Sequence, residues 1–226
     1  LLIGLGQVTY AFGDGAWFVL EALLGQDPYP SIADAGYLLS YPLYFAGLMR
    51  FPIRRRTGRE VAVLVLDVAV VVASAFLVLW SAVLGQAVDA GVNDLSGALD
   101  IAYPLGDLVL VTGITAVMLG GVTIHQRPLR WLTAGFVIWV LADVLWNYVD
   151  ETFVGGDWLD LVWLATLALI AIAADQQRTT VRAARTEGRA QRDALPKVNL
   201  LPYVAVLASY GVILRVVLTL PFYPLG

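Results

Sequence analysis

Carboxylates inside apolar stretches are the residues of this chain best suited to chemistry. Asp14 lies in "YAFGDGAWFVLEALLG" and Asp143 in "LADVLWNYVD", and both stretches are apolar enough for the interior of a lipid bilayer. A charged side chain at the bilayer centre costs at least about 2.5–3.5 kcal/mol, so both aspartates should face a bundle interior or water. Carboxylates placed there could bind a cation or an amine, or exchange protons as acid–base groups.

The two aspartates hold equivalent places in a pattern that occurs twice. The pattern is G-x7-D-x2-W, and its copies are Gly6, Asp14, Trp17 and Gly135, Asp143, Trp146. Residues three apart lie on one face of a helix, about 5–6 Å from each other, so each copy points a carboxylate and an indole the same way. We expect the two helices to share one polar, aromatic cavity. The alternative is a dry core in which protonated aspartates hydrogen-bond to neighbouring helices.

A further pair of matching positions begins the helix that follows each copy. Asp34 and Tyr37 in "PSIADAGYLL" correspond to Asp160 and Trp163 in "DWLDLVWLA". An even number of predicted spans separates the copies, so the two units have the same orientation in the membrane. The sequence therefore predicts a parallel internal repeat, with units at about 1–52 and 129–175.

The tripeptide Tyr-Pro-Leu recurs in "SYPLYF", "AYPLGD" and "FYPLG". We interpret Pro104 as a helix-entry residue, and we expect Pro42 to lie inside a span, where it would bend the helix over the cavity. The cavity should open outward, with Asp14 and Asp143 as its floor, and it would suit an amphiphilic or amine ligand. The candidate ligand-binding residues are Asp14, Trp17, Asp34, Tyr37, Tyr41, Tyr103, Asp107, Asp143, Trp146, Asp160 and Trp163.

The elements that must position these residues are membrane-spanning helices. Hydrophobic residues make up 59% of the chain, against about 45–50% apolar content in soluble domains. Several stretches approach the roughly 20 residues that a helix needs to cross a bilayer. We expect a single all-α polytopic transmembrane bundle of about seven spans, at 1–25, 34–52, 61–85, 99–124, 129–152, 157–175 and 199–221.

Basic residues predict the orientation of this bundle. Apart from Arg215, every Arg and Lys lies in "RFPIRRRTGR", "QRPLR" or "RTTVRAARTEGRAQRDALPK", which are alternate connections. By the positive-inside rule these connections, including a basic loop at 176–198, and the N-terminal end should be cytoplasmic. The seventh span would then end outside, so we expect the chain to be part of a longer protein.

The residue inventory argues against several classes of function. The chain has no cysteine, one histidine (His125) and one lysine (Lys197), and both of these lie in predicted loops. A histidine or thiolate metal site, a Ser-His-Asp system and a retinal Schiff base are therefore not expected, and no cofactor, metal or catalytic residue is predicted. Nucleic-acid binding has little support because the net charge is −4 and no aromatic residues alternate with the arginines.

A resemblance to a known family rests on the order of six motifs. They are "FGDGAW", "PSIADAGYLLSYPL", "AYPLGDLVLV", "LADVLWNYVD", "WLDLVWLATLALIAIAA" and "LLPYVAVLASYG". This combination resembles the multi-span N-terminal region of actinobacterial membrane-bound cyclic-di-GMP signalling proteins, where such regions precede diguanylate cyclase or phosphodiesterase domains. The resemblance implies a membrane sensor or regulatory module in a bacterial inner membrane, and we expect its catalytic domain elsewhere in a longer chain.

Three functions remain open from the sequence. The first is a membrane-embedded input domain that binds a small or lipid-like ligand and controls a cytoplasmic effector domain of a longer chain. The second is an intramembrane enzyme that modifies lipids, although we expect no catalytic activity in this fragment. The third is a transporter that uses Asp14 and Asp143 as a proton or cation site. Membrane lipids are expected partners in each case, and the bundle could form a homodimer.

Overall fold

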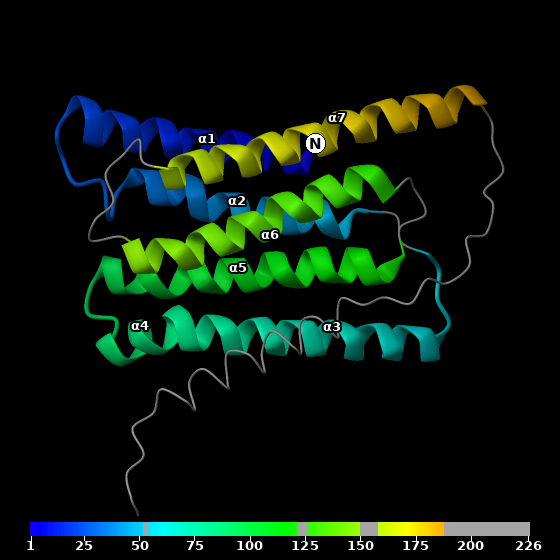
Figure 1. Ribbon diagram of the computed structural model, residues 1–226, viewed down its shortest axis with the longest axis horizontal. Coiled ribbons are helices and arrows are strands. Elements are labelled where there is room, and N and C mark those ends of the chain that lie inside the picture. The colour runs from blue at the N-terminus through cyan, green and yellow to red at the C-terminus, as the bar shows by residue number, and fades with distance from the viewer. Residues whose placement is uncertain (52–53, 122–125, 150–157, 188–226) are drawn as a thin grey trace, which may run out of the picture.

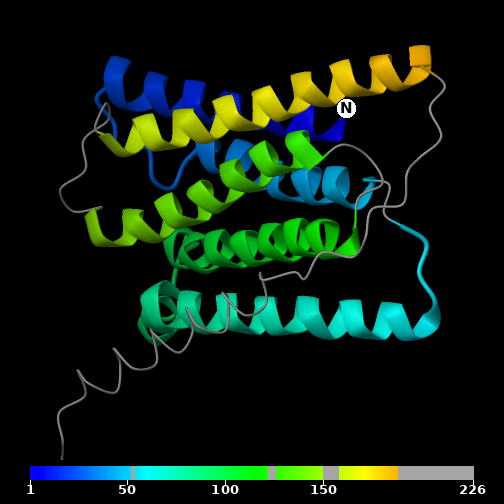
Figure 2. The same ribbon diagram turned by 45° about the vertical axis from the view of Figure 1, so that its right-hand side comes forward.

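The computed structural model describes residues 1–51, 54–121, 126–149 and 158–187. These residues form six long helices that lie side by side and alternate in direction, with no strand in the described ranges (Figures 1 and 2). The prediction of an all-α fold is confirmed for this part of the chain. The predicted span at 199–221, with Arg215, lies outside the described residues, as do His125 and Lys197.

The helices have the following bounds. α1 (Leu2–Phe18) ends in a π-helical turn η1 (Val19–Leu23), and α2 (Ile32–Met49) follows. α3 (Gly58–Leu79) continues through a π-helical turn η2 (Trp80–Leu84) into the short α4 (Gly85–Ala90). The remaining helices are α5 (Leu95–Gly120), α6 (Gln126–Val149) and α7 (Trp158–Glu187).

Four stretches are long and apolar enough to cross a membrane, namely Gly58–Ala90, Leu95–Gly120, Arg127–Trp146 and Trp158–Thr179. The chain is therefore compatible with a membrane protein that has several helical spans. α1 and α2 are not among these four stretches, so this measure does not reproduce the predicted number of seven. α3 exposes large aliphatic side chains such as Val63, Val65 and Leu66 on its surface, as a helix in contact with lipid would.

Side-chain caps explain where three of the helices begin. The Ser31 hydroxyl accepts from the Ala33 amide at 3.1 Å, and the Asp34 carboxylate accepts from the Ser31 amide at 2.7 Å. These bonds form a capping box that starts α2 at Ile32. Thr57 and Glu60 cap α3 in the same way, and Asp94 accepts from the Gly97 amide at the start of α5. Asp34, predicted only as a ligand-binding residue, therefore also has a structural role.

The helix bounds correct one sequence-based expectation and extend a second predicted element. Pro104 lies inside α5, which begins at Leu95, so its interpretation as a helix-entry residue is wrong. The basic segment that starts at residue 176 is helical as far as Glu187, because α7 continues past the apolar stretch without a break. Polar residues such as Gln and Arg have high helix propensity, so the end of the apolar run does not end the helix. Pro42 lies inside α2, as expected.

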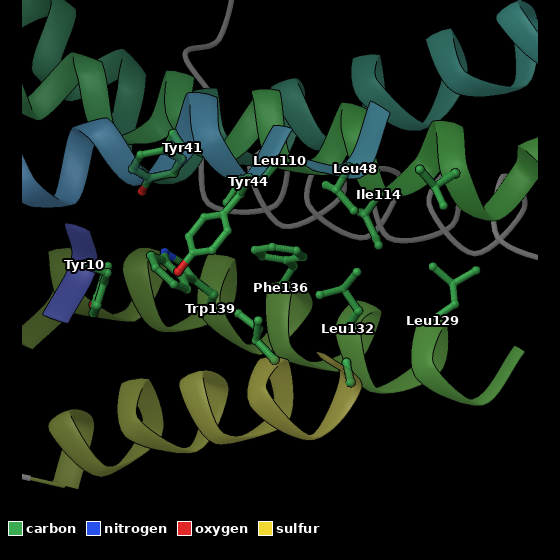
Figure 3. Close-up of a cluster of buried hydrophobic side chains, with 13 residues drawn as sticks. Tyr10, Tyr41, Tyr44, Leu48, Leu110, Ile114, Leu129, Leu132, Phe136 and Trp139 are labelled. Carbon is green, nitrogen blue, oxygen red and sulfur yellow. The ribbon is translucent and has the colours of Figure 1, made fainter. Parts of the chain in front are cut away.

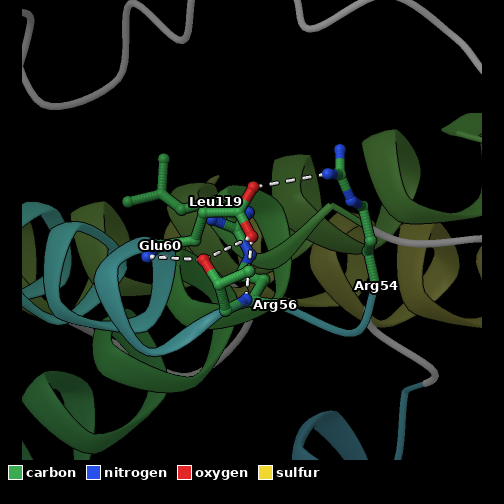
Figure 4. A network of polar contacts seen from close by, with 5 residues as sticks. Arg54, Arg56, Glu60 and Leu119 are labelled. Atoms are coloured by element: carbon green, nitrogen blue, oxygen red, sulfur yellow. Dashed lines mark hydrogen bonds and ion pairs between the residues drawn. The ribbon is translucent and has the colours of Figure 1, made fainter.

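One end of the bundle is held by contacts between the connection after α2 and the end of α5. The Arg56 guanidinium donates to the Leu119 carbonyl at 2.5 Å (Figure 4). The Arg54 amide donates to the Gly121 carbonyl at 3.0 Å. Gly121 has a φ of 70°, a left-handed conformation that glycine adopts without strain, and it ends α5. Arg54 also forms an exposed ion pair with Glu60 at 3.3 Å.

The core lies where α1, α2, α5, α6 and α7 meet, and it is rich in aromatic residues. Tyr10, Tyr41, Tyr44, Phe136 and Trp139 lie together with aliphatic residues in one buried cluster (Figure 3). The Tyr44 ring packs edge-on against both Phe136 and Trp139, with centroid separations of 5.2 and 5.7 Å. This cluster places the candidate site at the contact between α2 and α6.

Candidate functional site

The first candidate carboxylate, Asp14, is bound by its own helix pair. The Tyr37 hydroxyl of α2 donates to Asp14 Oδ1 of α1 at 3.1 Å. Both side chains are half-buried. Close packing of the helices makes this bond reachable, because Gly13 lies against the Tyr37 ring and Gly36 against the Thr9 carbonyl. The predicted face that carries Asp14 thus faces the helix that carries Tyr37.

The second carboxylate, Asp143, accepts the corresponding bond from the corresponding helix. The Trp163 indole N–H of α7 donates to Asp143 Oδ1 at 2.8 Å. The Trp139 indole N–H, one helical turn before Asp143, donates to its other oxygen at 2.9 Å. Asp143 is therefore held by α6 and α7 much as Asp14 is held by α1 and α2.

Two further contacts occur at matching positions of these helix pairs. The Ser40 hydroxyl donates to the Tyr37 carbonyl at 2.7 Å, and the Thr166 hydroxyl donates to the Trp163 carbonyl at 2.6 Å. Both hydroxyl residues are fully buried. A methyl group added at Gly6 would meet the Tyr44 ring at 2.7 Å, and one added at Gly135 would meet Ile170 at 3.0 Å. Each glycine thus permits a close approach of the following helix.

The two helix pairs meet through aromatic residues from matching positions. The Tyr10 and Trp139 rings lie 4.5 Å apart in an edge-on arrangement. The Trp17 and Trp146 rings lie 6.4 Å apart and are nearly perpendicular. α1 and α6 run in the same direction (Figures 1 and 2), so residues at the same position of each helix face one another. The predicted pair Trp17 and Trp146 is therefore brought together.

The Tyr-Pro-Leu tyrosines bind carboxylates of other helices. The Tyr41 hydroxyl lies 3.1 Å from Asp107 Oδ1 of α5 and 3.2 Å from Asp143 Oδ2 of α6, so it bridges three helices. The Tyr103 hydroxyl donates to Asp34 Oδ1 at 2.5 Å. Asp34, Tyr41 and Asp107 are buried, with exposed fractions of 4%, 4% and 2%. These residues form a hydrogen-bonded polar core. A core of this kind is the alternative that the sequence analysis set beside a ligand cavity open to the outside.

The other candidate residues lie closer to the surface of the bundle. Trp146 and Trp163 are half-buried, with ring centroids 5.7 Å apart, and Asp160 near the start of α7 is also half-buried. Trp17 is half-buried as well, and its indole N–H donates to Glu21 at 2.7 Å. The predicted residues on α2 and α5 are thus mostly buried, although Tyr37 and Tyr103 are half-buried, and those on α1, α6 and α7 form a half-buried aromatic and acidic group.

Several residues of the site were missed in the sequence. Tyr10 and Trp139 stand at equivalent positions of the two G-x7-D-x2-W copies, four residues before the aspartate, but neither was selected. Ser40 and Thr166 each follow the aromatic donor by three residues. A search of the repeat for any matching aromatic or hydroxyl positions would have found all four. The same search would not have found Tyr44, because the residue at the matching position of the second helix pair is Ile170, which is not aromatic.

A hydrogen bond ties the loop before α2 to the N-terminal part of α5. The Tyr29 hydroxyl donates to Asp100 Oδ1 at 2.6 Å and lies 3.3 Å from the Ser96 carbonyl. Burial raises the pKa of the Tyr29 phenol, and the hydrogen bond to the Asp100 carboxylate and its negative charge raise this pKa further. This contact lies at the bundle end opposite to Arg54 and Arg56.

The described residues contain no group of three His, Cys, Asp or Glu side chains placed to hold a metal ion. Comparisons with protein-family models, with curated proteins and with solved structures found no match to this chain. The arguments about its function therefore rest on the sequence and on the geometry described above.

Proposed function

We propose that this bundle is a membrane-embedded sensory or regulatory module. In this proposal a small or lipid-like ligand binds the half-buried aromatic and acidic group formed by Asp14, Trp17, Trp146, Asp160 and Trp163. Carboxylates beside indole rings suit an amphiphile with an amine head group, through ionic and cation–π contacts. The effector would be a cytoplasmic signalling domain of the cyclic-di-GMP turnover type, located elsewhere in a longer chain.

The single observation that carries this proposal is the continuity of α7. The helix binds Asp143 through Trp163 in its second turn and continues without interruption to Glu187. In Figures 1 and 2 its end extends beyond the neighbouring helices. A helix is stiff along its axis, so a ligand that displaces Trp163 would also displace the far end of α7. This is the element through which binding would reach an effector.

The distribution of charge supports an orientation with this end in the cytoplasm. Arg50, Arg54 and Arg127 lie at the end of the bundle where α2 ends and α6 begins. The opposite connections, which follow η1 and α4, contain carboxylates and no Arg or Lys. By the positive-inside rule, the N-terminal end of α1 is cytoplasmic. The resemblance to actinobacterial membrane proteins favours the bacterial inner membrane.

We also propose that α1 with α2 and α6 with α7 are two copies of one ancestral helix pair. The matching carboxylate bonds, hydroxyl bonds and close-packed glycines described above support this repeat. The copies would be related by a rotation about an axis along the membrane normal, because α1 and α6 run in the same direction. Such an axis would pass between Tyr10 and Trp139 and between Trp17 and Trp146, which are the matching residues in contact.

Binding can be tested with long-chain amines of defined structure. The chain would be reconstituted in lipid nanodiscs and titrated with dodecylamine or dodecyltrimethylammonium, with tryptophan fluorescence and thermal unfolding as readouts. We expect both amines to change the fluorescence and to raise the unfolding temperature, and we expect Asp14→Asn to weaken this response. Asp89→Asn removes the same charge at an exposed place on α4 and should respond like the wild type. Equal responses from the two variants would rule out binding at Asp14.

Transmission along α7 needs a separate measurement. Because the chain has no cysteine, Arg50→Cys and Thr179→Cys introduce two unique labelling sites at exposed positions near the same end of the bundle. We expect the distance between spin labels at these sites to change when the amine binds. A bound amine that leaves this distance unchanged would speak against a sensor and in favour of a carrier or an enzyme.

A further inference from the structure

The contact of Tyr41 with two carboxyl groups carries an inference that does not depend on the sensory proposal. Tyr41 comes from α2, Asp107 from α5 and Asp143 from α6, and the two carboxyl oxygens lie 3.1 and 3.2 Å from the same hydroxyl. A phenol has one hydrogen, so it can donate to one of these oxygens at a time. The contact with the other oxygen is a full hydrogen bond only when that carboxyl group is protonated and donates to the phenol oxygen. Ionised carboxylates are acceptors only, so this arrangement requires one additional proton.

The positions of the other donors indicate which carboxyl group carries this proton. Asp143 accepts indole N–H bonds on both oxygens, from Trp163 at 2.8 Å and from Trp139 at 2.9 Å. Such bonds favour the ionised form of a carboxyl group. Asp107 is 2% exposed, and its hydrogen bond is with the Tyr41 hydroxyl. The charge therefore belongs on Asp143 and the proton on Asp107.

Two facing stripes of phenols and carboxyls connect this pair with one end of the bundle. On α5 the stripe is Asp100, Tyr103 and Asp107, and on α2 it is Asp34, Tyr37 and Tyr41, both with the spacing i, i+3, i+7 that keeps residues on one helix face. The Tyr103 hydroxyl is bonded to Asp34, and the Tyr103 and Tyr41 ring centroids lie 6.5 Å apart. Asp100 at the outer end of the stripe is exposed and bound to Tyr29.

We propose that Asp107 and Asp143 form a binding site for one exchangeable proton, with Tyr41 as the bridging donor. The proton would leave Asp107 and reach the aqueous phase past Tyr103 and Asp34. This leaves both carboxyl groups ionised, and their repulsion would then act between α5 and α6. The proposal requires no redox step and no other ligand, so it stands whether or not the bundle binds an amine.

Other titratable groups lie on the helices around this pair. They include Tyr10 and Asp14 on α1, Tyr44 on α2, Tyr103 on α5 and Asp160 on α7. All of these are acids or phenols, so each can only add negative charge when it ionises. Deprotonation of Asp107 is therefore opposed by its surroundings, and one proton remains bound over a wide range of pH.

Infrared spectroscopy of the full chain in nanodiscs tests the proposal directly. A protonated carboxyl group has a C=O stretching band that is separate from carboxylate bands and that shifts in D2O. We expect the wild type to show this band at neutral pH, Asp107→Asn to lose it, and Tyr41→Phe to shift it, because its hydrogen-bond partner is removed. Asp89→Asn, which removes an exposed carboxylate, should leave the band unchanged. Tyr103→Phe should keep the band but slow its exchange of hydrogen for deuterium.

Each result has a defined meaning. The absence of the band in the wild type, or its persistence in Asp107→Asn, would overturn the proposal. Asn has the shape of the protonated acid, so Asp107→Asn is expected to fold, and its helix content would be checked by circular dichroism. If this variant did not fold, Tyr41→Phe would decide, because an unshifted band there contradicts a proton shared at Tyr41. Unchanged exchange in Tyr103→Phe would overturn the route to the outer end.

Discussion

At the scale of single residues, the polar core consists of hydrogen bonds that aromatic side chains donate to carboxylates. Tyr37 binds Asp14, Tyr103 binds Asp34, and Trp163 binds Asp143. A phenol or an indole brings a large apolar ring together with one N–H or O–H donor, so it can satisfy a buried carboxylate without introducing a second charge. This choice of partner suits a bilayer, where an unpaired polar group is costly.

Removal of one indole donor measures what such a bond contributes. Trp163→Phe keeps an aromatic ring but deprives Asp143 Oδ1 of its 2.8 Å hydrogen bond. We expect the free energy of unfolding to fall by about 0.6–1.7 kcal/mol, the range of hydrogen bonds between membrane helices. Denaturant titration in detergent micelles would measure the loss. Trp158→Phe alters an exposed tryptophan at the start of the same helix and should have little effect. Equal losses in the two variants would mean that the bond contributes nothing.

The Tyr29 phenol predicts a dependence of stability on alkaline pH. Its pKa is raised in the folded chain by burial and by Asp100, whereas the unfolded phenol titrates at about 10. Below that pH the phenol is protonated in both states and its full stabilisation is present. As pH rises above about 10 the unfolded state loses this proton first, so the stabilisation declines. We expect the stability of Tyr29→Phe to be lower at neutral pH and to fall less steeply above pH 10 than that of the wild type. Parallel curves would contradict this account.

At the scale of elements, α1 and α2 approach so closely that their backbones are in contact. A methyl group added at Gly36 would lie 2.7 Å from the Thr9 carbonyl oxygen and 2.9 Å from the Gly13 amide nitrogen. Backbone atoms cannot move aside as a flexible side chain can. This close packing is what brings the Tyr37 hydroxyl within 3.1 Å of Asp14.

An alanine substitution at this contact should therefore separate the two helices. We expect Gly36→Ala to lower the free energy of unfolding by about 1–3 kcal/mol, as overpacking in cores does. Gly15→Ala is the matched control, because nothing lies within 4 Å of a methyl group there. That change should be neutral or should stabilise α1 by up to about 1 kcal/mol through helix propensity. Thermal unfolding of both variants in the same detergent would compare them, and equal stability would contradict the packing argument.

At the scale of the whole molecule, the fold collects the basic connections at one end and the acidic ones at the other. The contacts of Arg54 and Arg56 with the end of α5 place the connection after α2 beside the C-terminal end of that helix. The link from Tyr29 to Asp100 joins the acidic connection before α2 to the start of α5 at the opposite end. A membrane around this bundle would therefore separate two surfaces of different charge.

Cysteine labelling of intact cells tests the orientation that follows from this asymmetry. The chain has no native cysteine, so Arg55→Cys and Asn93→Cys each give a single site, at exposed positions of opposite ends. A maleimide that does not cross membranes should label Asn93→Cys in intact cells and should label Arg55→Cys only after the cells are opened. Labelling of Arg55→Cys from outside would reverse the proposed orientation.

The sequence by itself determined the helical class, the approximate positions of the helices and the two matching carboxylate–aromatic sets. These features are local, because hydrophobic composition and the three-residue spacing on a helix depend on neighbours in the chain. It placed the start of α2 two residues late, since the cap at Ser31 is polar and lies outside the apolar run. It also ended the sixth predicted span at residue 175, although α7 continues to Glu187.

Only the tertiary structure decided which of these residues bind one another. Asp107 meets Asp143 through Tyr41, and Tyr10 faces Trp139, because α2, α5 and α6 pack side by side and α1 points the same way as α6. The spacing of residues fixes a face on each helix, but the rotation and the neighbours of that helix are set by the packing of all the others. Contacts between residues far apart in the chain, such as the Tyr41 bridge, therefore depend on the assembled bundle and cannot be obtained from any single segment.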